Sequence, residues 1–206
     1  MWPGVKYKTV LYCNPNLKSL SPRDKKFIED FKEACGSTEV EFSSQLPTIE
    51  KLTSLQTDQE WRAMVVADDF MDSAYKSSAI QHLFGRLGTH NYLDCALLVQ
   101  FAFSKGEFFS SIFNSASAIV LFRNPSNRQQ VQHINTKMFP KLSSKKGSHK
   151  FLQKALKRAQ QIMGVHGYIV INCCPQNPLT DRYQLSCNVL PNSKGKIRAT
   201  YFKNPE

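Results

Sequence analysis

Met64-Val65-Val66-Ala67-Asp68-Asp69 decides the fold, because a short apolar run ends there in two adjacent carboxylates. An uninterrupted apolar run of this length is typical of a strand that is buried on both faces of a parallel sheet. Ligands of open parallel sheets collect at the carboxyl ends of the strands. The stretch therefore predicts a buried strand that presents Asp68 and Asp69 at a binding edge.

Further apolar runs alternate with helical patterns along the chain. The predicted strands cover residues 9–13, 39–42, 64–67, 96–99, 118–122, 168–172 and, as a short edge strand, 183–189. The predicted helices cover residues 22–35, 49–55, 72–87, 126–138 and 151–163. This alternation predicts an α/β fold, with a mainly parallel sheet and helices on both of its faces. No repeat, linker or domain boundary is visible, so we expect a single domain over residues 1–206.

The acidic pair suits a division of labour in phosphate chemistry. Asp68 is suited to hold Mg²⁺, directly or through water, and Asp69 to orient the water that attacks a γ-phosphate. The next predicted strand ends at Gln100. We expect its amide at the same edge of the sheet, where it is suited to sense the phosphate and the water. The alternatives are a loop pair of aspartates that caps the following helix and a solvated glutamine at a strand end.

An apolar strand that ends in acids is also the form of the Walker B motif of P-loop ATPases. Their Walker A motif, G-x-x-x-x-G-K-[ST], is absent from the sequence, and Lys105-Gly106, Lys146-Gly147-Ser148 and Gly195-Lys196 are the nearest approaches. That loop supplies backbone N–H groups and a lysine to the phosphates. Each hydrogen bond to a charged group contributes about 1.5–3 kcal/mol. We therefore expect most of the nucleotide affinity to be missing.

An ordered series of segments resembles the FtsK/HerA-type viral genome-packaging ATPases, above all those of polinton-like and adintovirus-like elements, which are related to the poxvirus packaging ATPase. The segments are Asp68-Asp69-Phe70-Met71, Leu83-Phe84-x-x-Leu87-Gly88-Thr89-His90-Asn91, Leu98-Val99-Gln100, 115–125, 130–134, 166–172 and 188–191. The resemblance implies a RecA-like fold and a homo-oligomer, usually a ring. It also implies ATP and Mg²⁺ as cofactors and the movement of double-stranded DNA.

The resemblance also implies roles for individual residues. Asp68 matches the metal-associated acid, Asp69 the catalytic acid and Gln100 the sensor. Arg86 and Arg123 are candidate arginine fingers, because both are expected near strand carboxyl ends; the alternative for each is a structural or DNA-facing role.

The chain departs from this family at its front. Family members carry the P-loop on a strand inside the sheet, before the strand that ends here at Cys13, whereas only residues 1–8 precede that strand in this sequence. Loss of that strand would leave its neighbours with open edges or make them close up. We therefore expect a truncated or degenerate copy, with a shortened gene model as the equal alternative.

The charge balance favours a polyanionic partner. Twenty-seven Lys and Arg against 16 Asp and Glu give a formal net charge of +11. Such a surface neutralises nucleic-acid phosphates and releases their counterions. The predicted DNA-binding residues are Lys145, Lys146, Lys150, Lys154, Lys157 and Arg158, with an ordinary solvated helix face as the alternative. The basic tail, about residues 192–206, is expected to be disordered.

The cysteine spacing and the hydropathy of the sequence indicate the cellular compartment. The six cysteines form no C-x-x-C pair and show no zinc-ligand spacing, which favours a reducing environment. No apolar run reaches the roughly 20 residues of a membrane span. We expect a soluble protein of the cytoplasm or nucleus with no membrane partner.

Two functions remain open from the sequence. The first is a DNA-moving ATPase, and the second is a non-catalytic nucleic-acid-binding or assembly module that has kept the fold. A metal-dependent nuclease is less well supported, because no further acidic cluster would complete a two-metal site.

Overall fold

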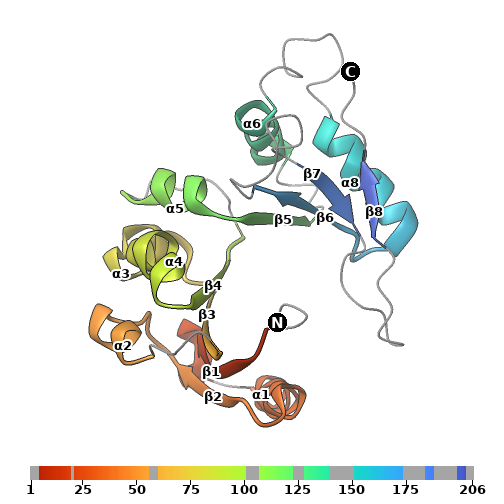
Figure 1. The fold of residues 1–206 in the computed structure, drawn as a ribbon. Helices are drawn as coiled ribbons and strands as arrows, with labels where there is room; N and C mark the ends of the chain where they lie inside the picture. The colour runs from red at the N-terminus through yellow and green to blue at the C-terminus, as the bar shows by residue number, and fades with distance from the viewer. Residues whose placement is uncertain are drawn as a thin grey trace. The chain divides into compact units, whose positions relative to one another are not determined.

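The computed structural model describes residues 5–19, 21–55, 60–100, 107–122, 128–139, 151–173, 184–187 and 199–202. The chain forms two compact units, residues 1–115 and 116–206. Each unit contains its own four-stranded sheet (Figure 1). The single domain expected from the sequence stays a prediction.

Unit 1 is an α/β unit with a parallel sheet. Its strands are β1 (Tyr7–Cys13), β2 (Glu39–Ser43), β3 (Arg62–Asp68) and β4 (Leu93–Leu98), in the order β2-β1-β3-β4. All three strand pairs are parallel. After β1 the chain adds β2 on one side and β3 on the other, so the switch point of the sheet lies between the carboxyl ends of β1 and β3. The parallel α/β prediction is confirmed for this unit.

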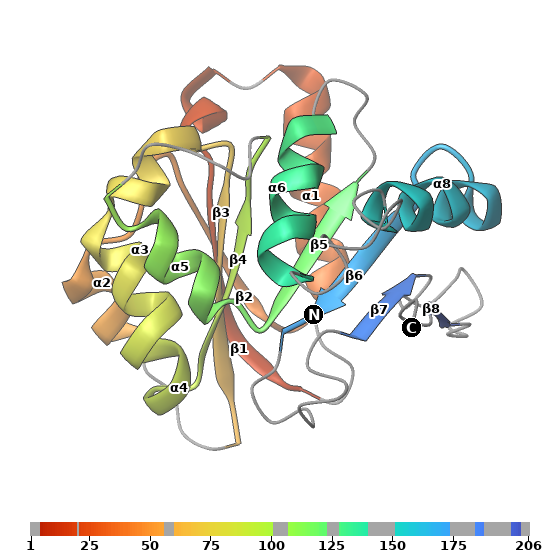
Figure 2. The same ribbon diagram turned by 90° about the horizontal axis from the view of Figure 1, so that it is seen from above.

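Helices cover both faces of the unit 1 sheet, as Figure 2 shows. On one face, α1 (Pro22–Cys35) brings Phe31 against a buried cluster that contains Val10 and Tyr12. On the other face lie α2 (Ile49–Ser54), α3 (Ser78–His82), α4 (Gly88–His90) and α5 (Phe109–Ser115). Leu52, Ile80 and Ile112 of these helices pack there against Leu11 and Val65 of the sheet. The described strands pair without a gap, so a further strand has room only beyond β2 or β4.

The prediction of one continuous helix over residues 72–87 is wrong. The chain forms instead the 3-10 helix η2 (Met71–Lys76), α3, the π-helical turn η3 (Leu83–Leu87) and α4. The first break comes at Ser77, which is extended and whose side chain caps α3 by accepting a hydrogen bond from Ile80 N. The second comes at Gly85, whose φ of −91° and ψ of −107° are not helical. Local capping and backbone chemistry here outweigh the helical spacing of the apolar residues.

Unit 2 contains β5 (Ala118–Phe122), α6 (Arg128–Met138), α8 (Phe151–Met163), β6 (Tyr168–Asn172), β7 (Gln184–Cys187) and β8 (Thr200–Phe202). Every strand pair of its β5-β6-β7-β8 sheet is antiparallel. The mainly parallel sheet expected from the sequence is therefore wrong for this unit. Cross-strand pairs such as Phe122–Tyr168 and Leu121–Ile169 make both faces of the sheet apolar. The sequence pattern of a strand that is apolar on both faces does not distinguish a parallel partner from an antiparallel one.

Two smaller expectations also fail in unit 2. The strand predicted as an edge strand over residues 183–189 is β7, which pairs with β6 on one side and β8 on the other. Residues 200–202 of the tail that we expected to be disordered form β8. In the described part of the chain, no helix is long and apolar enough to cross a membrane.

Candidate functional site

The acidic pair lies at a tight turn at the carboxyl end of β3. Asp68 is the last residue of the strand, and Asp69 has a φ of 60°, in the left-handed region. Aspartate tolerates this conformation better than most residues because its short polar side chain bonds locally. The N–H of Asp69 donates to the carbonyl oxygen of Leu98 at 3.3 Å, which ties the turn to the end of β4. The turn thus fixes both carboxylates at the edge where the parallel strands end.

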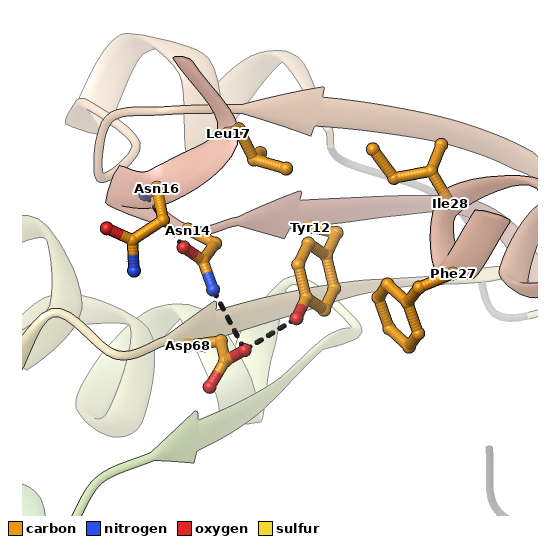
Figure 3. A pocket seen from close by; sticks show the side chains of 7 residues that line it. All are labelled: Tyr12, Asn14, Asn16, Leu17, Phe27, Ile28 and Asp68. Atoms are coloured by element: carbon orange, nitrogen blue, oxygen red, sulfur yellow. Dashed lines mark hydrogen bonds between the residues drawn. The ribbon is translucent and has the colours of Figure 1, made fainter. Parts of the chain in front are cut away.

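Asp68 is held from the β1 side by two donors. The Tyr12 hydroxyl donates to Oδ2 of Asp68 at 2.6 Å, and Asn14 Nδ2 donates to the same oxygen at 3.0 Å (Figure 3). Such charge-assisted hydrogen bonds are short and strong. Among the described residues, none donates to the other oxygen, Oδ1. One carboxylate oxygen is therefore locked, and the other remains open to water, a metal ion or a ligand.

Tyr12 serves this site as a neutral donor. Burial raises the pKa of its hydroxyl, and the hydrogen bond to the Asp68 carboxylate and the negative charge of that group raise the pKa further. The tyrosine consequently keeps its proton well above neutral pH. The hydroxyl therefore donates to Asp68 at every pH at which the protein is expected to work.

Asp69 faces a different pair of donors. Gln100 Nε2 donates to Oδ1 of Asp69 at 3.1 Å, and Asn16 Nδ2 donates to Oδ2 at 3.2 Å. Gln100 is exposed and follows β4, and Asn16 lies in the 3-10 helix η1 (Pro15–Ser19) after β1. The structure thus brings Asp68, Asp69 and Gln100 together at one edge, as the sequence led us to expect.

Sequence reasoning missed Tyr12, Asn14 and Asn16. Asn14-Pro15-Asn16 directly follows β1, and its sequence indicates only the end of a strand. The side chain of Asn14 accepts a hydrogen bond from Asn16 N at 2.8 Å, an Asx turn that shapes this loop. Two amides directly after a predicted strand are the sequence signal for Asn14 and Asn16, whereas no local pattern marks Tyr12.

Neither arginine of the sequence analysis is placed at this edge. Arg86 is exposed in η3, which runs towards the amino end of β4. Tyr92, just before β4, accepts a hydrogen bond from Ala63 N at the amino end of β3, opposite the acidic pair. The expected position of Arg86 near a carboxyl end is therefore wrong, and its use by a neighbouring subunit stays a prediction. Arg123 lies outside the described residues.

The basic helix α8 has one exposed cationic face. Lys154, Lys157 and Arg158 are all exposed, and they lie at the three- and four-residue spacing of one helix face. The opposite face is buried through Leu152, Ala155, Leu156 and Ala159. Arg158 donates to Oε1 of Gln161 at 3.2 Å. Lys145, Lys146 and Lys150, also predicted to bind DNA, lie outside the described residues.

The oxygen ligands at this edge suit Mg²⁺ better than a metal ion that requires three or more protein ligands. No group of three or more His, Cys, Asp or Glu side chains gathers within the described ranges. Mg²⁺ commonly binds through one or two carboxylates and keeps several waters. Oδ1 of Asp68 meets that requirement, whereas each oxygen of Asp69 already accepts a hydrogen bond from one amide.

Comparison with known proteins gives no relative. No family model matches the chain, and no curated protein or solved structure matches it significantly. The resemblance to packaging ATPases therefore stays an expectation.

Proposed function

We propose that this chain is a DNA-packaging or DNA-translocating ATPase-like protein with a RecA-like core, which keeps the acidic half of the site and lacks the Walker A loop. The observation that carries the proposal is the gathering of Asp68, Asp69 and Gln100 at the carboxyl ends of β3 and β4. The parallel sheet with helices on both faces supports it. Ligands of such sheets bind at this edge.

In this proposal each side chain has a role that its contacts support. Asp68, fixed through Oδ2 by Tyr12 and Asn14, would hold Mg²⁺ through Oδ1, directly or through water. Asp69, held between Asn16 and Gln100, orients the attacking water. Gln100, in contact with Asp69, senses the γ-phosphate. Bound Mg²⁺ would neutralise charge on the phosphates.

The absence of a phosphate-binding loop limits the ATP affinity and the ATP turnover of the isolated chain. Without Walker A, several charge-assisted hydrogen bonds to the phosphates are absent. We infer that the isolated chain binds ATP weakly and turns it over slowly or not at all. It is active only where a partner subunit or another segment supplies the hydrogen bonds to the phosphates.

A second function is favoured by the cationic face of α8. Lys154, Lys157 and Arg158 project from one side of a helix whose other side is buried. Such a face binds the DNA backbone without reading its sequence. The alternative is therefore a non-catalytic nucleic-acid-binding module that has kept the fold.

Binding of Mn²⁺, a paramagnetic substitute for Mg²⁺, tests the role of Asp68. We expect Asp68→Asn to weaken Mn²⁺ binding by about tenfold, the effect of losing about 1.4 kcal/mol, because it removes the charge of a carboxylate whose Oδ1 accepts no hydrogen bond from the described residues. The measurement is the enhancement of water-proton relaxation during a Mn²⁺ titration. Asp30→Asn, an exposed position on α1, is the control for net charge. Equal affinities of the two variants would contradict the proposed metal site.

A further inference from the structure

A pocket lies beside the acidic pair, on its β1 side. Its volume is about 490 Å³, and Figure 3 shows the side chains around it. The apolar part of its lining is Leu17, Phe27 and Ile28. The polar part is Tyr12, Asn14, Asn16 and Asp68. Asp69 and Gln100 do not line it, but Asn16 joins the pocket to Asp69, to which it donates.

The apolar part presents an aromatic ring to solvent. Phe27 is 47% exposed and lines the pocket. Its ring lies 5.9 Å from that of Tyr12 between centroids, so one side of it is supported. Leu17 and Ile28 complete the apolar lining of the pocket. This arrangement suits a flat, apolar ligand face.

The polar part offers a carboxylate acceptor beside amide groups. Tyr12 and Asn14 both donate to Asp68, and Asn14 also accepts from Asn16 N. Among the described residues, Oδ1 of Asp68, the lone pairs of the Tyr12 hydroxyl oxygen and the second N–H of Asn14 are left for a ligand. A ligand that pairs with the Asp68 carboxylate must bring a hydrogen-bond donor. A bare phosphate group does not fit it, because the Asp68 carboxylate would repel it.

We propose that this pocket binds an amino-bearing nucleobase. The ring lies against Phe27, Leu17 and Ile28, and its exocyclic amino group donates to Asp68. Aromatic rings hold bases of any sequence by stacking. Carboxylates accept hydrogen bonds from the amino groups of bases. Adenine and cytosine meet both requirements, whereas uracil carries no amino group.

The proposal deepens the proposed function, since use of the pocket by ATP rests on that function. The base would then be held by the pocket, and binding would depend on the base more than on the phosphates. Base contacts would thus partly compensate for the missing phosphate loop.

Adenosine, uridine and Mg·ATP titrated into the full chain test this inference. Saturation-transfer NMR detects the bound base, and calorimetry gives the affinity. We expect adenosine to bind about as tightly as Mg·ATP, and uridine about tenfold more weakly, for want of one hydrogen bond to a charged group. Phe27→Ala should weaken adenosine binding about tenfold, within the range measured for loss of one stacking ring.

The control is Phe122→Ala, which removes a 62% exposed phenylalanine from unit 2. It should leave adenosine binding unchanged. Absence of adenosine binding, or an equal affinity of Phe27→Ala and the wild type, would overturn the nucleobase pocket. Binding of Mg·ATP without binding of adenosine would also overturn it, while leaving the proposed ATPase-like function in place. Phe27-dependent adenosine binding with unaltered Mn²⁺ affinity of Asp68→Asn would support the pocket and contradict the metal site.

Discussion

Asp94→Ala is expected to lower the free energy of unfolding by about 3 kcal/mol, because it breaks an ion pair shared by three strands. Oδ1 of Asp94 accepts from Arg62 Nη2 at 2.6 Å, and Oδ2 accepts from the Tyr7 hydroxyl at 2.7 Å. These residues lie at the amino ends of β4, β3 and β1. The side chains of Arg62 and Asp94 are only 31% and 23% exposed, so the variant leaves a largely buried guanidinium without its carboxylate.

Urea denaturation followed by circular dichroism measures this effect. The control is Glu60→Ala, which breaks the Lys6–Glu60 pair, whose side chains are 62% and 69% exposed. Exposed pairs contribute about 0–1 kcal/mol, so this variant should shift the transition little. Similar shifts for the two variants would show that the Asp94 network does not hold the strand ends together.

Reversing two charges on α8 is expected to have the largest effect on DNA binding. Lys154→Glu with Lys157→Glu should weaken binding to duplex DNA by about a hundredfold at moderate salt. Each lost phosphate contact should also lower the salt dependence, log Kd against log salt concentration, by about 0.9. Both side chains are exposed on a helix that is anchored by its other face, so folding should be preserved.

Fluorescence anisotropy of a labelled duplex, measured over a series of salt concentrations, gives both quantities. Lys25→Glu with Lys26→Glu is the matched control, since these lysines are exposed on α1 of unit 1. A slope reduced equally by both double variants would indicate a response to net charge alone. The face of α8 would then not be a DNA-binding surface.

The sequence predicted the central features of unit 1 because they rest on local patterns. The apolar run before Asp68 forms a parallel strand, and Gln100 after the next strand contacts Asp69. Both follow from one rule, that parallel strands end at the same edge. The rule needs only the order of strands and helices along the chain.

The features that the sequence did not reveal depend on contacts between distant segments. The hydrogen bond from Tyr12 to Asp68 joins residues 56 positions apart, and it requires β1 to lie directly beside β3. The antiparallel sheet of unit 2 was hidden because Val120 and Leu121 are both apolar although they face opposite sides. Strand direction in such a sheet is set by pairing partners, which apolar runs do not specify.

Calorimetric titration of Mg·ATP into the 206-residue chain, and in parallel into its Asp69→Asn variant, is the most direct test of an acidic site that lacks a phosphate-binding loop. We expect a dissociation constant of about a millimolar, near −4 kcal/mol, close to that of adenosine and unchanged in Asp69→Asn. Asp69 orients water in this scheme and does not hold the nucleotide. Micromolar binding of Mg·ATP, at least a hundredfold tighter than that of adenosine, would contradict it, because some segment would then grip the phosphates.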